Sequence, residues 1–333
     1  MKIKVGINGL GRIGRMIIRS IIENDNKNIE IKHINNRTNS EASSTLLKYD
    51  SIHGKFNAKI SYDEKHIIIN NNKITFSQET DLNNISWKKY SVDYVFECTG
   101  KFNSKDKLEP HLKNGAKKVI VSAPCKNADK TIVFGVNELE LKKDDQIISA
   151  GSCTTNCLAP VAFVLNENFE IEKGFMTTIH AFTSDQRILD NSHKDPRRAR
   201  SASQSIVPTS TGASKIIGEI IPSLKDKLGG IAMRVPTPNV SLIELVFCTK
   251  KDLSIEKINS VFKSFSKKNK VLEFTKEKLV SIDFNHNPAS SIVDGSLTNV
   301  IGKNMGKISA WYDNEWGFSN RMCDIAEHLY KIS

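Results

Sequence analysis

Two cysteines four residues apart, Cys153 and Cys157, follow an apolar run and a glycine near the middle of the chain. Such a pair can be two metal ligands, a redox pair, one nucleophile with a bystander, or two small buried residues. Ser152 is a typical helix N-cap, which puts Cys153 in the first turn and Cys157 one turn deeper on the same face. The helix dipole and the free N–H groups there favour a thiolate. We therefore expect Cys153 to be the reactive thiol and Cys157 a packing residue.

The remaining cysteines argue against a metal or disulfide framework. None of them has a second cysteine at ligand spacing, so the sequence predicts no metal. The chain enters a strand directly, without a signal-peptide pattern, and no apolar run reaches the length of a membrane helix. We expect a cytoplasmic protein with no membrane partner, in which all six cysteines stay reduced.

A thiolate nucleophile usually needs a base beside it. Of the eight histidines, His180 is the best placed, because it ends an apolar strand just before a polar segment, 183–205, that shows no regular period. A loop of that length inside a compact domain is uncommon and usually functional. Position alone makes His180 the leading candidate but leaves other histidines open.

A glycine-rich turn near the N-terminus indicates a second site. Gly9, Gly11 and Gly14 follow a predicted strand, Lys2–Asn8, and begin a helix that runs to Glu23. This order of elements is the one in which the pattern binds a dinucleotide. The glycines allow a tight turn and let a pyrophosphate approach the free N–H groups of the helix.

The elements around these residues predict an α/β protein of two domains. Residues 1–152 alternate strands and helices, typical of a doubly wound Rossmann domain for NAD(P). Residues 153–316 read as an α+β catalytic domain with a largely antiparallel sheet, and the helix 317–333 is expected to pack back on the first domain. The strands expected in the first domain after Asn8 are Ile29–Asn35, Ile67–Asn70, Tyr94–Glu97, Val119–Val121, Ile132–Phe134 and Ile147–Ser149.

The end of the second strand bears on the choice of cofactor. An acidic residue there would bind the ribose 2′-hydroxyl of NAD, but this chain has Asn36 followed by Arg37. Without the carboxylate a 2′-phosphate is not repelled, and Arg37 could pair with it. The sequence therefore favours NADP or tolerance of both cofactors. The alternative is that Asn36 bonds the ribose neutrally while Arg37 points to solvent.

The net charge of +11 raises the question of nucleic-acid binding. The lysines are scattered and no basic block is interleaved with aromatic residues, so we expect a generally basic surface and no specific nucleic-acid site.

With these motifs together, the chain resembles the phosphorylating glyceraldehyde-3-phosphate dehydrogenases from end to end. The matching segments are Gly6–Arg15, Lys48–Gly54, Ser152–Cys157, Thr209–Ala213, Ala232–Pro238 and Trp311–Gly317. The resemblance implies a homotetramer that uses glyceraldehyde 3-phosphate and inorganic phosphate. It makes Cys153 the nucleophile and His180 its base. A hemithioacetal would pass hydride to the nicotinamide, and phosphate would cleave the resulting thioacyl enzyme.

The resemblance also implies two anion sites. Thr183 and Arg234 match positions that hold the C3 phosphate of the substrate. The inorganic-phosphate side is matched by Ser152, Thr154, Thr211, Gly212 and Arg198. Arg197 and Arg200 flank Arg198, so the choice among the three arginines stays open.

For the cofactor, Arg12 and Ile13 match the pyrophosphate turn, and Ser122 and Asn314 match positions near the nicotinamide, with Asn314 on its carboxamide. Two departures point toward NADP. Asn36 replaces the aspartate typical of NAD-specific members, and Ser192 stands where those bacterial members often have proline. Ala150-Gly151 also replaces the usual Asn-Ala before the nucleophile motif.

The nearest rival is erythrose-4-phosphate dehydrogenase, which shares the cysteine and histidine motifs. That group typically departs from the Thr211-Gly212-Ala213 pattern, so the triose enzyme is favoured here. Non-enzymatic binding of nucleic acid or protein has no discrete support in the sequence. Whether the enzyme works in the glycolytic or gluconeogenic direction is not determined.

Overall fold

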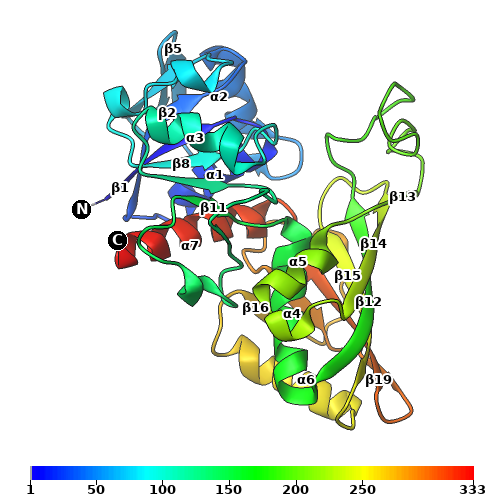
Figure 1. Ribbon diagram of the computed structural model, residues 1–333. Helices are drawn as coiled ribbons and strands as arrows, with labels where there is room; N and C mark the ends of the chain where they lie inside the picture. Colours follow the sequence, from blue (N-terminus) through cyan, green and yellow to red (C-terminus); the bar gives the residue numbers. More distant parts are fainter. Residues whose placement is uncertain (1) are drawn as a thin grey trace. The chain divides into compact units, whose positions relative to one another are not determined.

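The computed structural model describes residues 2–333 and divides into two compact units (Figure 1). Unit 1 comprises residues 2–134, Glu138–Ser152 and Ser319–Ser333, and unit 2 comprises Gly135–Asn137 and Cys153–Phe318. The division differs from the expected domains by the short segment Gly135–Asn137 and by residues 317–318, which belong to unit 2. No helix among the described residues is long and apolar enough to cross a membrane.

Unit 1 is built on a nine-stranded sheet in the order β10-β11-β9-β8-β1-β2-β7-β6-β5. All neighbours from β10 to β7 run parallel, and β6 and β5 extend the sheet antiparallel. Its strands are β1 (Ile3–Asn8), β2 (Ile29–Asn35), β5 (Ile60–Asp63), β6 (His66–Ile69), β7 (Asn72–Ser77), β8 (Tyr94–Glu97), β9 (Lys118–Val121), β10 (Lys130–Thr131) and β11 (Ile147–Ser149).

The parallel part of this sheet is the predicted doubly wound fold. Strands β8 and β9 are buried along their whole length, as expected when helices cover both faces. The predicted strand Ile132–Phe134 is wrong, because the strand in this region is β10 and ends at Thr131. The two-residue strands β3 (Tyr49–Asp50) and β4 (Gly54–Lys55) form a separate hairpin.

Four helices belong to unit 1: α1 (Arg12–Glu23), α2 (Ser40–Lys48), α3 (Lys105–Lys113) and α7 (Trp316–Ile332), the last from Ser319 onward. α7 is tied to α1 and the turn after it by hydrogen bonds from Ser20 to Asn320 and from Asn26 to Glu327. Short 3-10 turns lie at Leu82–Asn84, Lys88–Tyr90 and Glu138–Glu140.

Unit 2 contains an eight-stranded sheet in the order β13-β14-β12-β15-β19-β17-β16, with β18 paired to β19. It is antiparallel except between β12 and β14 and between β16 and β17. Its strands are β12 (Ile171–Ala181), β13 (Val207–Thr209), β14 (Leu228–Val235), β15 (Ser241–Thr249), β16 (Leu272–Thr275), β17 (Ser291–Asp294), β18 (Asn299–Ile301) and β19 (Met305–Tyr312).

Three helices, α4 (Cys153–Phe169), α5 (Ala213–Ile220) and α6 (Ile255–Ser266), cover one face of this sheet (Figure 1). Burial in β15 alternates residue by residue, so one face of the strand is packed and the other is partly open. Short 3-10 turns lie at Pro222–Leu224 and Ser281–Phe284. The segment 182–206, green in Figure 1, extends as a loop from the ends of β12 and β13.

Candidate active site and dinucleotide pocket

Cys153 and His180 meet in unit 2. Cys153 is the first residue of α4, and His180 is the penultimate residue of β12. The Sγ atom lies 3.5 Å from Nε2 of the imidazole, within hydrogen-bond reach for sulfur. His180 is buried, whereas Cys153 keeps part of its surface exposed. The pair has the geometry of a nucleophile and its base.

Burial acts against ionisation of both members of this pair. Burial raises the pKa of the Cys153 thiol, and the charge of Arg234 and the Thr154 N–H partly offset it. Burial, followed by the charge of Arg234, lowers the pKa of His180 to about 3. The N-terminus of α4 and Arg234 favour the thiolate, whereas desolvation opposes it.

Arg234 lies on the other side of the imidazole. Its Nη1 is 2.7 Å from Nδ1 of His180 and 3.2 Å from the carbonyl oxygen of Ala181, while Nδ1 is also 2.7 Å from that oxygen. When Nδ1 donates to Ala181, Nε2 is free to accept the thiol proton. When Arg234 donates to Nδ1, the ring proton sits on Nε2, which can then donate to the sulfur but cannot accept from it. Only the tautomer with the proton on Nδ1 can therefore take the thiol proton.

Cys157 lies one turn along α4 and is fully buried. Its Sγ is 3.5 Å from the Ser291 hydroxyl and 3.8 Å from the Ala310 carbonyl oxygen. Burial raises the pKa of this thiol far above its ordinary range. Cys157 is a packed neighbour of the reactive residue, as expected from the sequence.

The start of α4 explains part of the nucleophile motif. Gly151 has a φ of +67°, a left-handed conformation that favours glycine over the alanine usual in the family. The Thr154 hydroxyl is buried and lies 2.9 Å from the Tyr312 hydroxyl, which is also 2.9 Å from Thr178. The Thr154 hydroxyl is thus held beside the sulfur by Tyr312. Ser152 directly precedes the helix.

The polar loop after β12 is held by its own ion pairs. Arg198 binds Asp185 and, through Nε at 3.3 Å, Asp195. Arg200 binds Asp190 instead, 2.7 Å away. The charges of Arg198 and Asp185 both act on the pKa of Arg234, which places this ion pair near the catalytic residues. This observation favours Arg198 over its two neighbours.

Arg234 has spare hydrogen-bonding capacity. Its Nε is buried and has no partner among residues 2–333, an arrangement that an anion would satisfy. Thr183 begins the loop two residues after β12 and is partly exposed. Thr211 and Gly212 begin α5, where the Thr211 hydroxyl accepts from the N–H of Ala213 at 3.2 Å. No side chain caps the helix at Gly212, and the dipole at this N-terminus favours an anion beside the N–H groups that follow Ala213.

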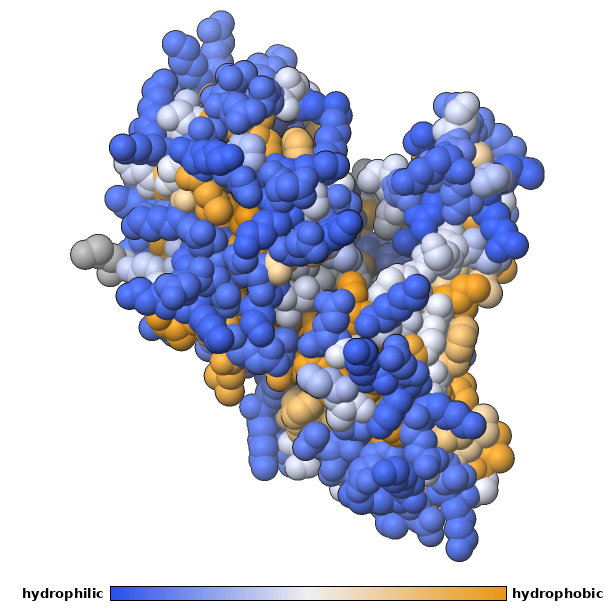
Figure 2. Space-filling view, viewed as in Figure 1, coloured by the Kyte–Doolittle hydropathy of each residue, from blue (hydrophilic) through white to orange (hydrophobic). Residues whose placement is uncertain are grey.

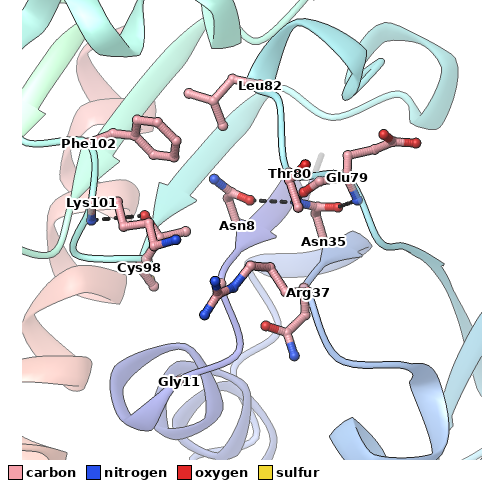
Figure 3. A pocket seen from close by; sticks show the side chains of 13 residues that line it. Asn8, Gly11, Asn35, Arg37, Glu79, Thr80, Leu82, Cys98, Lys101 and Phe102 are labelled. Carbon is pink, nitrogen blue, oxygen red and sulfur yellow. Dashed lines mark hydrogen bonds between the residues drawn. The ribbon is translucent and has the colours of Figure 1, made fainter. Parts of the chain in front are cut away.

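Unit 1 contains a pocket of about 380 Å³ at the carboxyl ends of its strands, shown in Figure 3. The wall combines residues that follow β1, β2, β7 and β8: Asn8, Gly9, Gly11, Asn35, Asn36, Arg37, Glu79, Thr80, Leu82, Cys98, Thr99, Lys101 and Phe102. Ligands of open α/β sheets bind at this edge, where the strand order reverses.

The glycine turn of this pocket fits a pyrophosphate. Gly9 has a φ of +94°, and a Cβ on Gly14 would lie 2.1 Å from the Gly9 carbonyl oxygen, so neither position accepts another residue. A Cβ on Gly11 would meet open space. No side chain caps α1 at Gly11. The N-terminus of α1 near Ile13 thus favours an anion.

Comparison with known proteins matches both units. Residues 3–105 match the model for the glyceraldehyde 3-phosphate dehydrogenase NAD binding domain, and residues 152–314 match that family's C-terminal domain. The chain is 48% identical to Glyceraldehyde-3-phosphate dehydrogenase 2 of Bacillus subtilis (strain 168), over 99% of this chain and 97% of that protein. It is also 48% identical to the glyceraldehyde-3-phosphate dehydrogenase of Cereibacter sphaeroides, over the full length of both.

The chain belongs to the glyceraldehyde-3-phosphate dehydrogenase family. The Geobacillus stearothermophilus glyceraldehyde-3-phosphate dehydrogenase is 46% identical over 99% of the chain and 98% of that protein. The pocket in unit 1 lies within the part that matches the NAD binding domain, so the protein binds a nicotinamide dinucleotide.

Sequence reasoning missed the role of Asp50. Its carboxylate binds both Nη atoms of Arg12 and accepts the N–H groups of Ile52 at 2.9 Å and His53 at 3.0 Å. The Arg12 side chain is therefore held by Asp50 and does not line the pocket. The shared motif Lys48–Gly54 was the signal that could have revealed this pairing.

The three remaining cofactor candidates lie in different places. Asn314 follows β19, and its Oδ1 accepts from the Ser241 hydroxyl at 2.9 Å. Ser122 follows β9, where its N–H donates to the Glu97 carbonyl oxygen at 3.0 Å. Ser192 lies in the exposed loop of unit 2, where its carbonyl oxygen accepts from Arg187 at 3.0 and 3.1 Å.

Proposed function

We propose that the protein oxidises D-glyceraldehyde 3-phosphate reversibly to 1,3-bisphosphoglycerate, with inorganic phosphate as co-substrate. The observation that carries this proposal is the Cys153–His180 pair at the mouth of α4, with Arg234 beside the imidazole. A thiol, an adjacent base and an uncompensated guanidinium are what an anionic aldehyde needs for covalent catalysis.

In the proposed mechanism, His180 accepts the thiol proton through Nε2 while the Cys153 sulfur attacks the aldehyde carbon. The resulting hemithioacetal oxyanion lies near the N-terminus of α4, whose backbone N–H groups stabilise it together with His180. The protonated His180 returns its proton to this oxygen, which gives a neutral hemithioacetal. A bound nicotinamide would supply the acceptor for the hydride of the substrate carbon. As the carbonyl re-forms, the now neutral His180 takes the hydroxyl proton, leaving a thioester on Cys153. Phosphate oxygen then attacks the thioester carbon, which releases the acyl phosphate and the thiolate.

We propose that the C3 phosphate binds Arg234 and Thr183. The buried unpaired Nε of Arg234 supports this assignment. A dianion there would also offset the positive charge of Arg234 beside Nδ1 of His180. This would raise the pKa of the imidazole toward its ordinary value. Substrate binding would in this way strengthen the base. We place inorganic phosphate at the N-terminus of α5, against Thr211 and Gly212, with Ser152 and Arg198.

We propose that NADP is preferred over NAD. The Asn36 side chain is engaged at both ends, accepting from Leu10 N–H at 3.2 Å and donating to Ser43 at 3.0 Å. This supports a positioning role for Asn36 and leaves Arg37, whose side chain extends across the pocket in Figure 3, as the group that meets a 2′-phosphate. Lys101 adds a second cation to the wall, and the Glu79 carboxylate points away.

We also propose that the protein is a homotetramer. Apolar side chains project from the loop and from the sheet of unit 2, among them Ile188, Leu189 and Ile206, which are 55–73% exposed, and Phe175 at 54%. Figure 2 shows apolar surface along the side of unit 2 where β12 and β14 run. Contiguous exposed apolar surface of this kind commonly marks a subunit interface.

The decisive experiment compares initial rates with glyceraldehyde 3-phosphate and phosphate in the presence of NAD or NADP. We expect acyl-phosphate formation with both and a higher kcat/KM with NADP. Reduction of either cofactor that did not depend on phosphate would overturn the proposed reaction, and a higher kcat/KM with NAD would overturn the cofactor preference alone.

A further inference from the structure

Ser241 is a buried hydroxyl that the mechanism above does not use. It is the first residue of β15, pairs with Tyr312 of β19 and is 1% exposed. Its Oγ accepts from the N–H of Ala181 at 3.0 Å and donates to Oδ1 of Asn314 at 2.9 Å. Ser241 thus connects the residue after His180 with the residue expected on the nicotinamide carboxamide.

These two hydrogen bonds determine how the Asn314 amide faces. A serine hydroxyl has one hydrogen and two lone pairs, and the N–H of Ala181 occupies a lone pair. If the Asn314 amide were turned so that Nδ2 faced Ser241, the buried hydroxyl hydrogen would lose its acceptor. Oδ1 therefore faces Ser241. In the part of the chain that the structure describes, residues 2–333, Nδ2 has no acceptor and is available to a ligand.

The backbone just before Ser241 is held in a strained conformation. Val240 has a φ of +65°, which is rare for a β-branched residue. Its side chain is packed in an apolar cluster with Phe284 and Ile292. The preceding Asn239 is anchored to Asp313 at 3.0 Å. Strain of this kind persists where the surrounding structure fixes it, and it clusters at functional sites. Here it places Ser241 between the ends of β12 and β19.

We propose that Ser241 is a positioning residue for the nicotinamide. By holding Oδ1 of Asn314, it presents Nδ2 as a donor to the carboxamide oxygen and so fixes the orientation of the ring near Cys153. The inference rests on the proposed function, because it requires Asn314 to contact the carboxamide. An Asn314 amide without this restraint could turn and offer Oδ1 to the carboxamide amino group instead.

Binding measurements test this without catalysis. Dissociation constants are measured by calorimetry for three probes: NAD, the analogue with no carboxamide on the pyridinium ring, and the 3-acetylpyridine analogue, which keeps the carbonyl but lacks the amino group. Each ratio to the NAD value reports on the substituent alone, because the adenosine half is common to all probes. We expect the bare-ring analogue to bind wild type about tenfold more weakly than NAD, which is the effect of one hydrogen bond. The acetyl analogue should bind like NAD.

The variants separate this inference from the proposed function. The bare-ring ratio is the dissociation constant of the analogue without a carboxamide divided by that of NAD. We expect this ratio to fall close to one in both Asn314→Ala and Ser241→Ala. Ser241→Thr, which keeps the hydroxyl, should preserve the wild-type ratio. If Asn314→Ala lowers the ratio and Ser241→Ala does not, the role of Ser241 is overturned while Asn314 keeps its assignment. If Asn314→Ala leaves the ratio unchanged, Asn314 does not contact the carboxamide. The assignments of Asn314 and of Ser241 are then both refuted.

Two controls address folding and orientation. Ser309→Ala removes another buried serine of the same sheet, whose hydroxyl donates to Glu244 at 3.4 Å, and should leave the ratio at its wild-type value. If Ser241→Ala fails to fold, Ser241→Cys keeps a weak donor at similar size and should give an intermediate ratio, whereas a wild-type ratio would count against the proposal. Binding of the acetyl analogue as weak as that of the bare ring would show that Asn314 accepts through Oδ1, and would overturn the assigned orientation.

Discussion

At the residue scale, the two cysteines of α4 differ because their surroundings differ. Cys153 touches His180 and reaches solvent, whereas Cys157 is enclosed by Ser291 and Ala310. We predict that Cys153→Ser abolishes phosphate-dependent cofactor reduction, a loss of at least about a thousandfold, because serine is a far weaker nucleophile at neutral pH. Cys157→Ser should keep kcat within about threefold, since only packing changes. Initial-rate assays decide between the two, and equal losses would refute the assignment.

The proton acceptor can be tested by alkylation. Iodoacetamide reacts with the thiolate, so its rate with Cys153 against pH reports the thiol pKa. Because burial raises that pKa and His180 is the group that can take the proton, we predict that His180→Asn moves the profile to higher pH and slows alkylation near pH 7 by about tenfold or more. His193→Asn, in the loop beside Asp185, is the matched control and should not shift it. An unchanged profile in His180→Asn would exclude His180 as the base.

Substitution of Asn36 tests the cofactor preference. An aspartate at this position would keep the acceptor for Leu10 N–H and place a negative charge beside a 2′-phosphate. We predict that Asn36→Asp lowers kcat/KM for NADP by about tenfold or more and affects NAD little, since only the phosphorylated ribose is repelled. Steady-state kinetics with both cofactors measure this. Asn28→Asp, which adds the same charge at an exposed position outside the pocket, is the control. An unaltered NADP value would contradict the 2′-phosphate argument.

At the element scale, Asp50 joins the β3–β4 hairpin to the first turn of α1. Burial raises the pKa of this carboxyl, but the hydrogen bonds from Arg12 and from the N–H groups of His53 and Ile52 outweigh burial, and the net pKa lies well below its ordinary value. A carboxyl with a lowered pKa in the folded state stabilises the fold above its unfolded pKa of about 4. The stabilisation is lost as the pH falls below that value.

We therefore predict that Asp50→Asn lowers the free energy of unfolding at pH 7 by about 3 kcal/mol, because Arg12 loses a buried partner. The difference between wild type and variant should shrink as the pH falls below about 4. Urea unfolding across this range tests it. Asp63→Asn, which breaks an exposed ion pair with Lys73, should cost less than about 1 kcal/mol. If the loss in free energy of unfolding for Asp50→Asn did not change with pH, lost packing would be its cause.

At the scale of the whole molecule, exposed apolar residues predict association. Leu189 is 73% exposed on the loop of unit 2. We predict that Leu189→Asp shifts the protein from tetramers toward smaller species, because a charge would be buried in the interface. Analytical ultracentrifugation at several concentrations measures this. Leu139→Asp changes a leucine that is 86% exposed in unit 1 and should have no effect. A wild type that sediments as a monomer would remove the basis of the prediction.

Much of the fold was readable from local sequence. The structure agrees with several predicted elements: the glycine turn, the strands Tyr94–Glu97 and Ile147–Ser149, and the helix that begins at Cys153. These were predictable because hydrophobic periodicity and glycine positions are local signals. Ile132–Phe134 was mistaken for a strand since its apolar side chains are buried without pairing. The same sequence signals placed the chain in its enzyme family.

The tertiary structure decided what depends on distant partners. The sequence determined that Cys153 starts a helix and that His180 ends a strand. Only the fold brings them within 3.5 Å and buries the thiol, which raises its pKa. Three other pairs also join residues that are distant in the chain: Asp50 with Arg12, Thr154 with Tyr312, and Ser241 with Asn314. Desolvation and hydrogen-bond geometry depend on every neighbour in space, and neighbours in space come from strands far apart in the chain.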